Sequence, residues 1–311
     1  MKSGTGANFP GVRNSHPSLI SPVPNSLFAL KHHLDSFLAG FPRDRHVPND
    51  PVQFVHRYDD AADREVAGLI ASAFAYGNVK IVLTTVERAL SFLGSRPAQA
   101  LAAFDPRKDQ RRLRGFYHRF NTSRDLAVFF WMMRRVLEDY GSIQAAFVHG
   151  MAAGDSDTGD AIHGFREILL NLGHEQFYSR TELRRRVAVR FFLPSPRDGS
   201  ACKRMNLYLR WMVRQDDGVD CGAWTRIRPD QLVIPLDTHI ARISGYIGLT
   251  SRKSPGWAMA LDITEQLRRL DRKDPLRYDF ALCHLGIAGD CPRKRDLWKC
   301  AHCPIQPVCR L

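Results

Sequence analysis

Apolar residues recur at helical spacing along most of the chain. Val66, Leu69, Ile70 and Ala73 fall on one helix face behind an acidic start at Asp59 and Asp60. Similar spacing predicts further helices over 79–93, 123–140, 160–172, 182–192, 201–214, 238–247, 256–270 and 274–286. Sustained two-residue alternation, which is typical of half-buried strands, is missing from the sequence. The pattern therefore predicts an all-α protein.

The pattern also suggests where the chain divides. Residues 1–25 contain four prolines and few periodic apolar residues, so we expect a flexible arm there. Residues 26–290 are expected to form a helical domain, long enough for two lobes, and residues 291–311 a separate cysteine-rich loop. The longest apolar run, Leu126 to Met133, is too short for a membrane helix, which needs about 20 residues. With no secretory signal visible, we expect a cytoplasmic protein.

Charge points to the kind of partner. The 311 residues include 45 Lys and Arg against 32 Asp and Glu, a formal net charge of +13. Residues 184–214 carry nine basic side chains and one acidic side chain, and residues 101–135 carry nine and three. Either run could be a solvated helix face. Together they favour a polyanionic partner, most often nucleic acid.

The seven cysteines are unevenly placed. Four of them, Cys291, Cys300, Cys303 and Cys309, lie in the last 21 residues with the spacing C-x8-C-x2-C-x5-C. An odd count with one dense cluster argues against a disulfide framework and for a metal site in a reducing compartment. Four thiolates can hold Zn²⁺ or an iron–sulfur cluster. Since only Cys300 and Cys303 form the C-x2-C pair that structural zinc sites usually repeat, we favour a [4Fe–4S] cluster over Zn²⁺.

Two segments carry residues suited to catalysis. Lys203 lies in a basic helical stretch, and Asp237 follows the apolar run 232–234 at the start of another predicted helix. Taken alone, Lys203 is most simply an exposed lysine and Asp237 a helix N-cap.

A resemblance gives these residues a function. A Leu193-Pro194 turn, Lys203 with Asn206 after it, the segment 237–240 (Asp-Thr-His-Ile) and the four-cysteine tail are together similar to the helix-hairpin-helix (HhH-GPD) DNA glycosylases. The iron–sulfur branch related to endonuclease III is the most similar, over residues 60–311. The chain as a whole also resembles an uncharacterised bacterial family of that superfamily. The resemblance implies an all-α, two-lobed fold with a DNA cleft between the lobes and a C-terminal iron–sulfur loop.

The resemblance also implies roles for individual residues. Lys203 would be the nucleophile that attacks C1′ of the target deoxyribose, and Asp237 the carboxylate that stabilises positive charge on the sugar. The predicted DNA-binding residues are Arg197, Gly199, Ser200, Arg204, Asn206 and Arg242. The expected protein is then a monomeric, nucleoid-associated base-excision glycosylase with AP-lyase activity, acting on a damaged base flipped out of duplex DNA.

Two alternatives remain open from sequence. The usual hairpin of these enzymes offers backbone N–H groups to a phosphate, whereas this chain has Ser195 and Pro196 there, and proline has no N–H. This departure motivates a non-catalytic nucleic-acid-binding iron–sulfur protein on the same fold. The second alternative is a redox-sensing iron–sulfur protein whose basic surface is incidental.

Overall fold

The computed structural model describes residues 27–311 except positions 153 and 216, so the arm predicted over 1–25 lies outside the described residues. The described part is mostly helical, which confirms the all-α prediction. Its only strands are β1 (Tyr117–His118) and β2 (Asn121–Thr122), which form one short antiparallel hairpin. None of its helices is long and apolar enough to cross a membrane.

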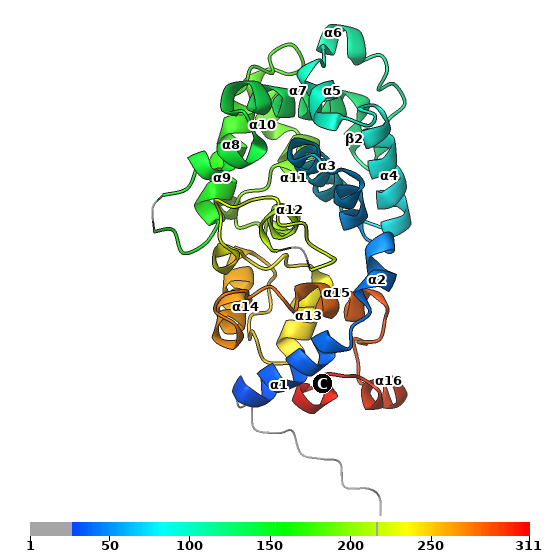
Figure 1. Ribbon diagram of the computed structural model, residues 1–311, viewed down its shortest axis with the longest axis vertical. Helices are drawn as coiled ribbons and strands as arrows, with labels where there is room; N and C mark the ends of the chain where they lie inside the picture. Colours follow the sequence, from blue (N-terminus) through cyan, green and yellow to red (C-terminus); the bar gives the residue numbers. More distant parts are fainter. Residues whose placement is uncertain (1–26, 153, 216) are drawn as a thin grey trace, which may run out of the picture.

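The helices follow one another through short connections (Figure 1). In the first half of the chain they are α1 (Leu27–Ala39), α2 (Arg43–His46), α3 (Ala61–Phe74), α4 (Val79–Ser91), α5 (Pro97–Ala102), α6 (Pro106–Asp109), α7 (Ser123–Tyr140) and α8 (Ile143–His149). In the second half they are α9 (Gly159–Leu170), α10 (Arg180–Arg185), α11 (Val187–Phe192), α12 (Lys203–Val213), α13 (Thr238–Tyr246), α14 (Trp257–Leu270), α15 (Asp279–Ile287) and α16 (Leu297–Ala301). Five short 3₁₀ turns, η1 (Val47–Asn49), η2 (Pro51–Arg57), η3 (Pro196–Asp198), η4 (Pro229–Gln231) and η5 (Gln306–Val308), complete the described elements.

Polar caps place the helix starts where the sequence predicts them. The Asp60 carboxylate accepts the N–H groups of residues 62 and 63 and begins α3, and Asn78 begins α4 in the same way. The carboxylate of Asp125 closes a capping box with Thr122 at the start of α7. These caps satisfy backbone donors that have no partner within the helix, so each fixes a helix boundary locally.

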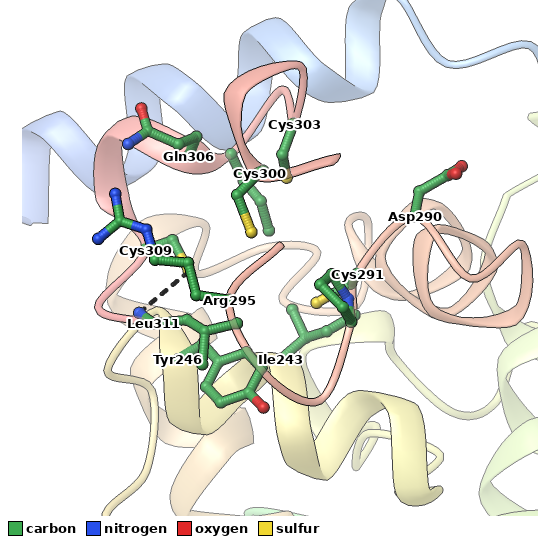
Figure 2. A pocket seen from close by; sticks show the side chains of 12 residues that line it. Ile243, Tyr246, Asp290, Cys291, Arg295, Cys300, Cys303, Gln306, Cys309 and Leu311 are labelled. Atoms are coloured by element: carbon green, nitrogen blue, oxygen red, sulfur yellow. Dashed lines mark hydrogen bonds between the residues drawn. The ribbon is translucent and has the colours of Figure 1, made fainter. Parts of the chain in front are cut away.

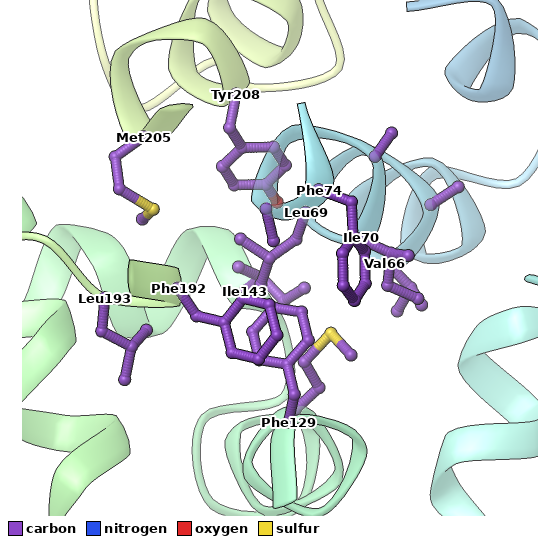
Figure 3. Close-up of a cluster of buried hydrophobic side chains, with 14 of the residues drawn as sticks. Val66, Leu69, Ile70, Phe74, Phe129, Ile143, Phe192, Leu193, Met205 and Tyr208 are labelled. Atoms are coloured by element: carbon purple, nitrogen blue, oxygen red, sulfur yellow. The ribbon is translucent and has the colours of Figure 1, made fainter. Parts of the chain in front are cut away.

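The first hydrophobic core surrounds α12, which passes through the middle of the molecule (Figure 1). Every residue of this helix after Lys203 is buried. Met205 and Tyr208 of α12 face Leu69 and Phe74 of α3, while Phe129 of α7 closes the cluster from the opposite side (Figure 3). Gly68 permits this close approach, because a Cβ there would lie 2.9 Å from Met212 and 3.1 Å from Tyr208. A helix buried on all sides has no solvent face, so its polar residues must find partners inside the protein.

A second hydrophobic core is built from both ends of the described chain. Leu34 and Leu38 of α1 pack with buried residues of α13, α14 and α15 and with Ile305 and Val308 near the C-terminus. In Figure 1 these helices lie together at the end of the molecule opposite α5 and α7. The α15 helix contributes to both cores, since Phe280 belongs to the first and Ala281, Leu282 and Leu285 belong to the second.

Buried ion pairs join the two cores. The Arg210 guanidinium, 2% exposed on α12, donates to Asp220 at 3.1 Å and also pairs with Asp279 at the start of α15. Arg214 reaches the same Asp220 and, at 2.8 Å, Asp274. Because each charge has an opposite partner, the network avoids the large cost of an isolated buried ion.

The prediction of one continuous helix over 182–192 is wrong. The segment is divided at Arg186, whose backbone has extended ψ of 118° between α10 and α11. The Arg186 guanidinium pairs with the fully buried carboxylate of Asp125 on α7. This contact between residues far apart in sequence outweighs the helical preference of the local stretch.

Candidate functional site

Asp237 lies at the boundary between a buried apolar segment and a helix. Residues 232–236 are buried, and the Ile234 N–H is bound at 3.0 Å by the Thr264 hydroxyl of α14. The chain then enters α13, and Asp237 Oδ1 accepts the N–H groups of His239 and Ile240, both at 2.8 Å. Asp237 is therefore the N-cap of α13. Only one carboxylate oxygen is needed for that task, and Oδ2 faces away from the capped amides.

Cys283 of α15 contacts this second oxygen. Its Sγ lies 3.4 Å from Asp237 Oδ2, within hydrogen-bonding distance for a thiol donor. The contact depends on a close crossing of α13 and α15 at Gly286, where a Cβ would lie 2.6 Å from the Cβ of His239. Cys283 was not among the residues predicted from sequence.

Lys203 is the only residue of α12 that is not buried, and it stands at the first position of the helix. The preceding residue, Cys202, has a left-handed backbone (φ 48°), which turns the chain sharply into α12. The Lys203 ammonium donates to the carbonyl of Ala75 at 3.3 Å, in the turn between α3 and α4. These contacts join segments that lie far apart in the sequence, so no local sequence pattern predicts them.

Lys203 and Asp237 both influence the charge state of Cys283. Burial raises the pKa of the Cys283 thiol well above its usual range, and the nearby Asp237 and Asp279 carboxylates raise it further. The Lys203 charge acts on the same thiol in the opposite direction. At neutral pH this thiol is protonated and can donate to Asp237. The thiol thus contacts the carboxylate directly, whereas the lysine acts on it through its charge.

Aromatic side chains surround the turn that Lys203 contacts. The Tyr76 ring is stacked on Phe120 at 5.7 Å and lies edge-on to Phe191 at 4.6 Å. The Arg204 guanidinium is 3.8 Å from the centre of the Phe191 ring. Phe120, at the tip of the β1–β2 hairpin, is 38% exposed. Tyr76 and Phe120 come together through tertiary packing, beside the turn that Lys203 contacts.

Three of the predicted DNA-binding residues are used inside the protein. Arg204 is 9% exposed, donates to the carbonyls of Ala73 and Phe191, and has its pKa lowered to about 10 by burial. Asn206 is 1% exposed and donates to the carbonyl of Ala201 at 3.1 Å. These two stabilise the entry into α12 and present no donor to a phosphate outside, so we do not retain them as DNA contacts.

The third of these residues, Arg242, is half-buried on α13. Its guanidinium donates to the carbonyl of Cys291 at 2.9 Å. Burial raises the pKa of the Cys291 thiol, and the nearby Arg242 charge offsets only part of that rise. Arg242 therefore holds the start of the cysteine loop, a role different from the DNA contact predicted for it.

The remaining predicted DNA-binding residues lie in the loop before α12. Arg197 is exposed and pairs with Asp160 at 3.1 Å. The Gly199 N–H donates to the carbonyl of Pro196, and the Ser200 hydroxyl accepts the N–H of Cys202. The loop is exposed at Arg197 and Gly199 but satisfies much of its own hydrogen bonding.

The four C-terminal cysteines line one pocket, together with Ile243 and Tyr246 of α13 (Figure 2). Burial and the other three thiols raise the pKa of Cys303 to about 11. Among the described residues, no set of three or more His, Cys, Asp or Glu side chains is arranged to hold a single metal ion. The four cysteines are the residues of this pocket that could hold a metal or a cluster.

The chain was compared with protein families, curated proteins and solved structures. The model of the family described as "Protein of unknown function (DUF2400)" matches residues 50–288, more than three quarters of the chain. The chain belongs to this family. No curated protein and no solved structure matches it significantly.

Membership of DUF2400 corrects the family resemblance drawn from sequence. No HhH-GPD or glycosylase family model matches the chain, so its assignment to the endonuclease III-like enzymes was wrong. The motifs behind that assignment were short, and the phosphate-binding hairpin among them was already altered at Ser195 and Pro196. The DUF2400 match includes Lys203, Asp237 and Cys283, but it ends before the four-cysteine loop.

Proposed function

We propose that this DUF2400 protein is a DNA glycosylase with AP-lyase activity that acts on damaged duplex DNA. The observation that carries the proposal is the contact of Asp237 with Cys283 at 3.4 Å, on a thiol that is also influenced by the charge of Lys203. An amine beside an anionic carboxylate is the pair required to displace a base and stabilise the sugar cation. The net charge of +13 favours a polyanionic substrate. We further propose that the protein acts as a monomer in the cytoplasm, at the nucleoid.

The proposed reaction begins at the Lys203 amine. Its lone pair attacks C1′, the C1′–N bond breaks, and the base leaves with the electron pair and takes up a proton. Loss of an amine proton and opening of the sugar ring give a protonated Schiff base. Removal of a C2′ proton then expels the 3′ phosphate by β-elimination. Asp237 stabilises the positive charge that develops at C1′ during the first step.

In this mechanism Cys283 is a positioning residue. Its thiol fixes the Asp237 oxygen that is not used in capping α13. We expect Cys283→Ala to lower the rate of base release by about threefold to tenfold, because one modest hydrogen bond is worth about 0.5–1.5 kcal/mol. Cys283→Ser retains a donor and should recover most of the rate.

Separate measurement of kcat and KM distinguishes positioning from a merely structural effect of Cys283. A thiol that positions Asp237 acts on the chemical step, so Cys283→Ala should lower kcat and leave KM for the duplex nearly unchanged. Equal losses in the alanine and serine variants, or a loss confined to KM, would contradict this role.

A duplex containing an abasic site gives a direct test of the proposed function, because it removes the need to know which base is recognised. Borohydride should reduce the Schiff base and leave a covalent protein–DNA adduct. A panel of duplexes with oxidised, deaminated or alkylated bases then identifies the substrate by base release. If the protein binds these duplexes but yields neither adduct nor released base, the enzymatic proposal fails and a non-catalytic nucleic-acid-binding role replaces it.

We also propose that Cys291, Cys300, Cys303 and Cys309 hold a [4Fe–4S] cluster. Their shared pocket supports a metal site, and the presence of only one C-x2-C pair favours the cluster over Zn²⁺. When bound, the cluster would be held by four cysteine thiolates, and it would tie the C-terminal loop rigidly to α13. In this proposal the protein residues alone carry the chemistry at Lys203 and Asp237.

Cys300→Ser is expected to remove most of the bound iron and the visible absorbance of the cluster, and to lower the melting temperature. A hard hydroxyl is a poor replacement for a thiolate, and loss of the cluster releases the loop from α13. Cys221→Ser is the matched control, since Cys221 is buried but does not line the pocket. Anaerobic purification followed by iron, sulfide and zinc analysis makes the measurement. Stoichiometric zinc without iron would instead establish the alternative site.

A further inference from the structure

The cysteine loop exposes an aromatic side chain that contributes nothing to either core. Trp298, on α16, is 72% exposed, and its neighbour Leu297 is 81% exposed. The backbone below them is well held, because the Asp296 carboxylate accepts the N–H groups of Trp298 and Lys299. Large apolar side chains displayed on a firmly held backbone usually mark a contact surface.

Trp298 also lines a hollow of about 360 Å³, in the size range of small-ligand sites. On its own side the indole lies against His302, with ring centres 4.6 Å apart. The opposite lining comes from Phe41, between α1 and α2, and His46 at the end of α2, whose rings are stacked at 4.7 Å with an interplanar angle of 14°. Such flat surfaces favour a planar, aromatic occupant over an aliphatic one.

Lys299 lines the hollow beside Trp298, together with one acidic residue, Asp290, and three more cations precede it on the loop. Arg293, Lys294, Arg295 and Lys299 are all exposed on the same loop. Some arginines elsewhere on the described surface pair with carboxylates, as Arg135 does with Glu138 and Asp139. In the described part of the chain, none of the four loop cations takes part in an ion pair. Lys299 uses its ammonium to bind the carbonyl of Gly289 at 2.8 Å.

We infer that Trp298 and this hollow bind an unpaired base of a nucleic-acid strand, with Arg293, Lys294 and Arg295 on the neighbouring phosphates. Aromatic stacking beside a run of cations is how proteins hold single strands without reading their sequence. A free nucleotide would fill the hollow, but it would not supply the run of phosphates that the three exposed cations Arg293, Lys294 and Arg295 can bind. The inference rests on the proposed action on nucleic acid and adds a second contact, outside the Lys203 site, that selects strands with an unpaired base.

Equilibrium binding tests the inference. Trp298→Ala should weaken binding to a duplex with an unpaired tail by about tenfold, since stacking on one base is worth about 1–3 kcal/mol. Affinity for the matching blunt duplex should change less than about twofold. Trp298→Phe retains a stacking ring and should bind the tailed duplex nearly as well as the original chain. Phe28→Ala, which removes an 80% exposed ring from α1, is the matched control and should have no effect.

Two further measurements complete the test. Lys294→Ala should reduce the slope of log affinity against log salt by about 0.7–0.9, the value for one phosphate contact. Deoxyadenosine monophosphate alone should compete only weakly. Iron content, measured in every variant, shows whether the loop retains its structure.

Equal affinity of Trp298→Ala and the original chain for the tailed duplex would overturn the inference, as would an equal loss on tailed and blunt duplexes. Tight binding of the free nucleotide would also overturn it, in favour of a nucleotide site. The proposed function is measured separately, by borohydride trapping on a blunt abasic duplex. Trapping without selection for the tail rejects only the inference, and selection without trapping rejects only the glycosylase proposal.

Discussion

Replacement of Lys203 by glutamine is expected to abolish the borohydride adduct and to lower base release by at least about 100-fold, because the amide has no nucleophilic lone pair. Glutamine retains a donor for the carbonyl of Ala75, so the turn between α3 and α4 should stay in place. Asp237→Asn tests the second member of the pair in the same way. Asparagine caps helices as well as aspartate does, so α13 should persist while the anion is lost.

Adduct yield, base release and DNA affinity are to be measured together on both variants. Lys273→Ala, which removes an exposed lysine far from these contacts in the sequence, serves as the control and should trap normally. If Lys203→Gln still forms the adduct, another amine is the nucleophile. If it loses the adduct but releases bases at the original rate, the protein is a monofunctional glycosylase that activates water.

The largest loss of stability is expected from Arg210→Met. This change leaves Asp220 and Asp279 buried without their main partner, and breaking a buried ion pair costs about 3–5 kcal/mol. Denaturant unfolding of the original chain and the variant gives the difference. Arg135→Met is the matched control, because its ion pairs are partly exposed and such pairs contribute about 0–1 kcal/mol.

The cost of Arg210→Met should also depend on pH. Burial already raises the pKa of Asp220, and that of Asp279 to about 6, while Arg210 acts to lower both. Without Arg210 these pKa values rise further above the value of about 3.9 in the unfolded chain. The folded variant then binds more protons than the unfolded chain, so its stability falls as pH rises above about 4. An equal cost at pH 5 and pH 8 would contradict this account.

The helix starts were predictable because their signals are local. Asp60 and Asn78 stand directly before apolar repeats, and their side chains bind amides two or three residues later. The break at Arg186 was not predictable in this way. It depends on a carboxylate 61 positions away, and the residues around it have ordinary helical preferences.

The site shows the same division between local and distant causes. Lys203 and Asp237 were chosen on the resemblance to the glycosylases, and the structure places them at the starts of α12 and α13. The same resemblance implied that Arg204 and Asn206 contact DNA, which requires a solvent face on their helix. The α12 helix has none, so both side chains point inward. Cys283 was missed because its contact with Asp237 arises where α13 crosses α15 at Gly286, and no spacing in the sequence encodes that crossing.

The second core has a consequence for the order of events during protein synthesis. Leu34 and Leu38 of α1 emerge from the ribosome long before their partners, the nearest of which is Val233. The first core draws most of its residues from positions 52–232, so it can form while the remainder is still being translated. The α1 helix must wait, unpaired, until α13–α15 appear. Among the described elements, the cysteine pocket is completed last against α13, so any metal is loaded into it only after both cores have been synthesised.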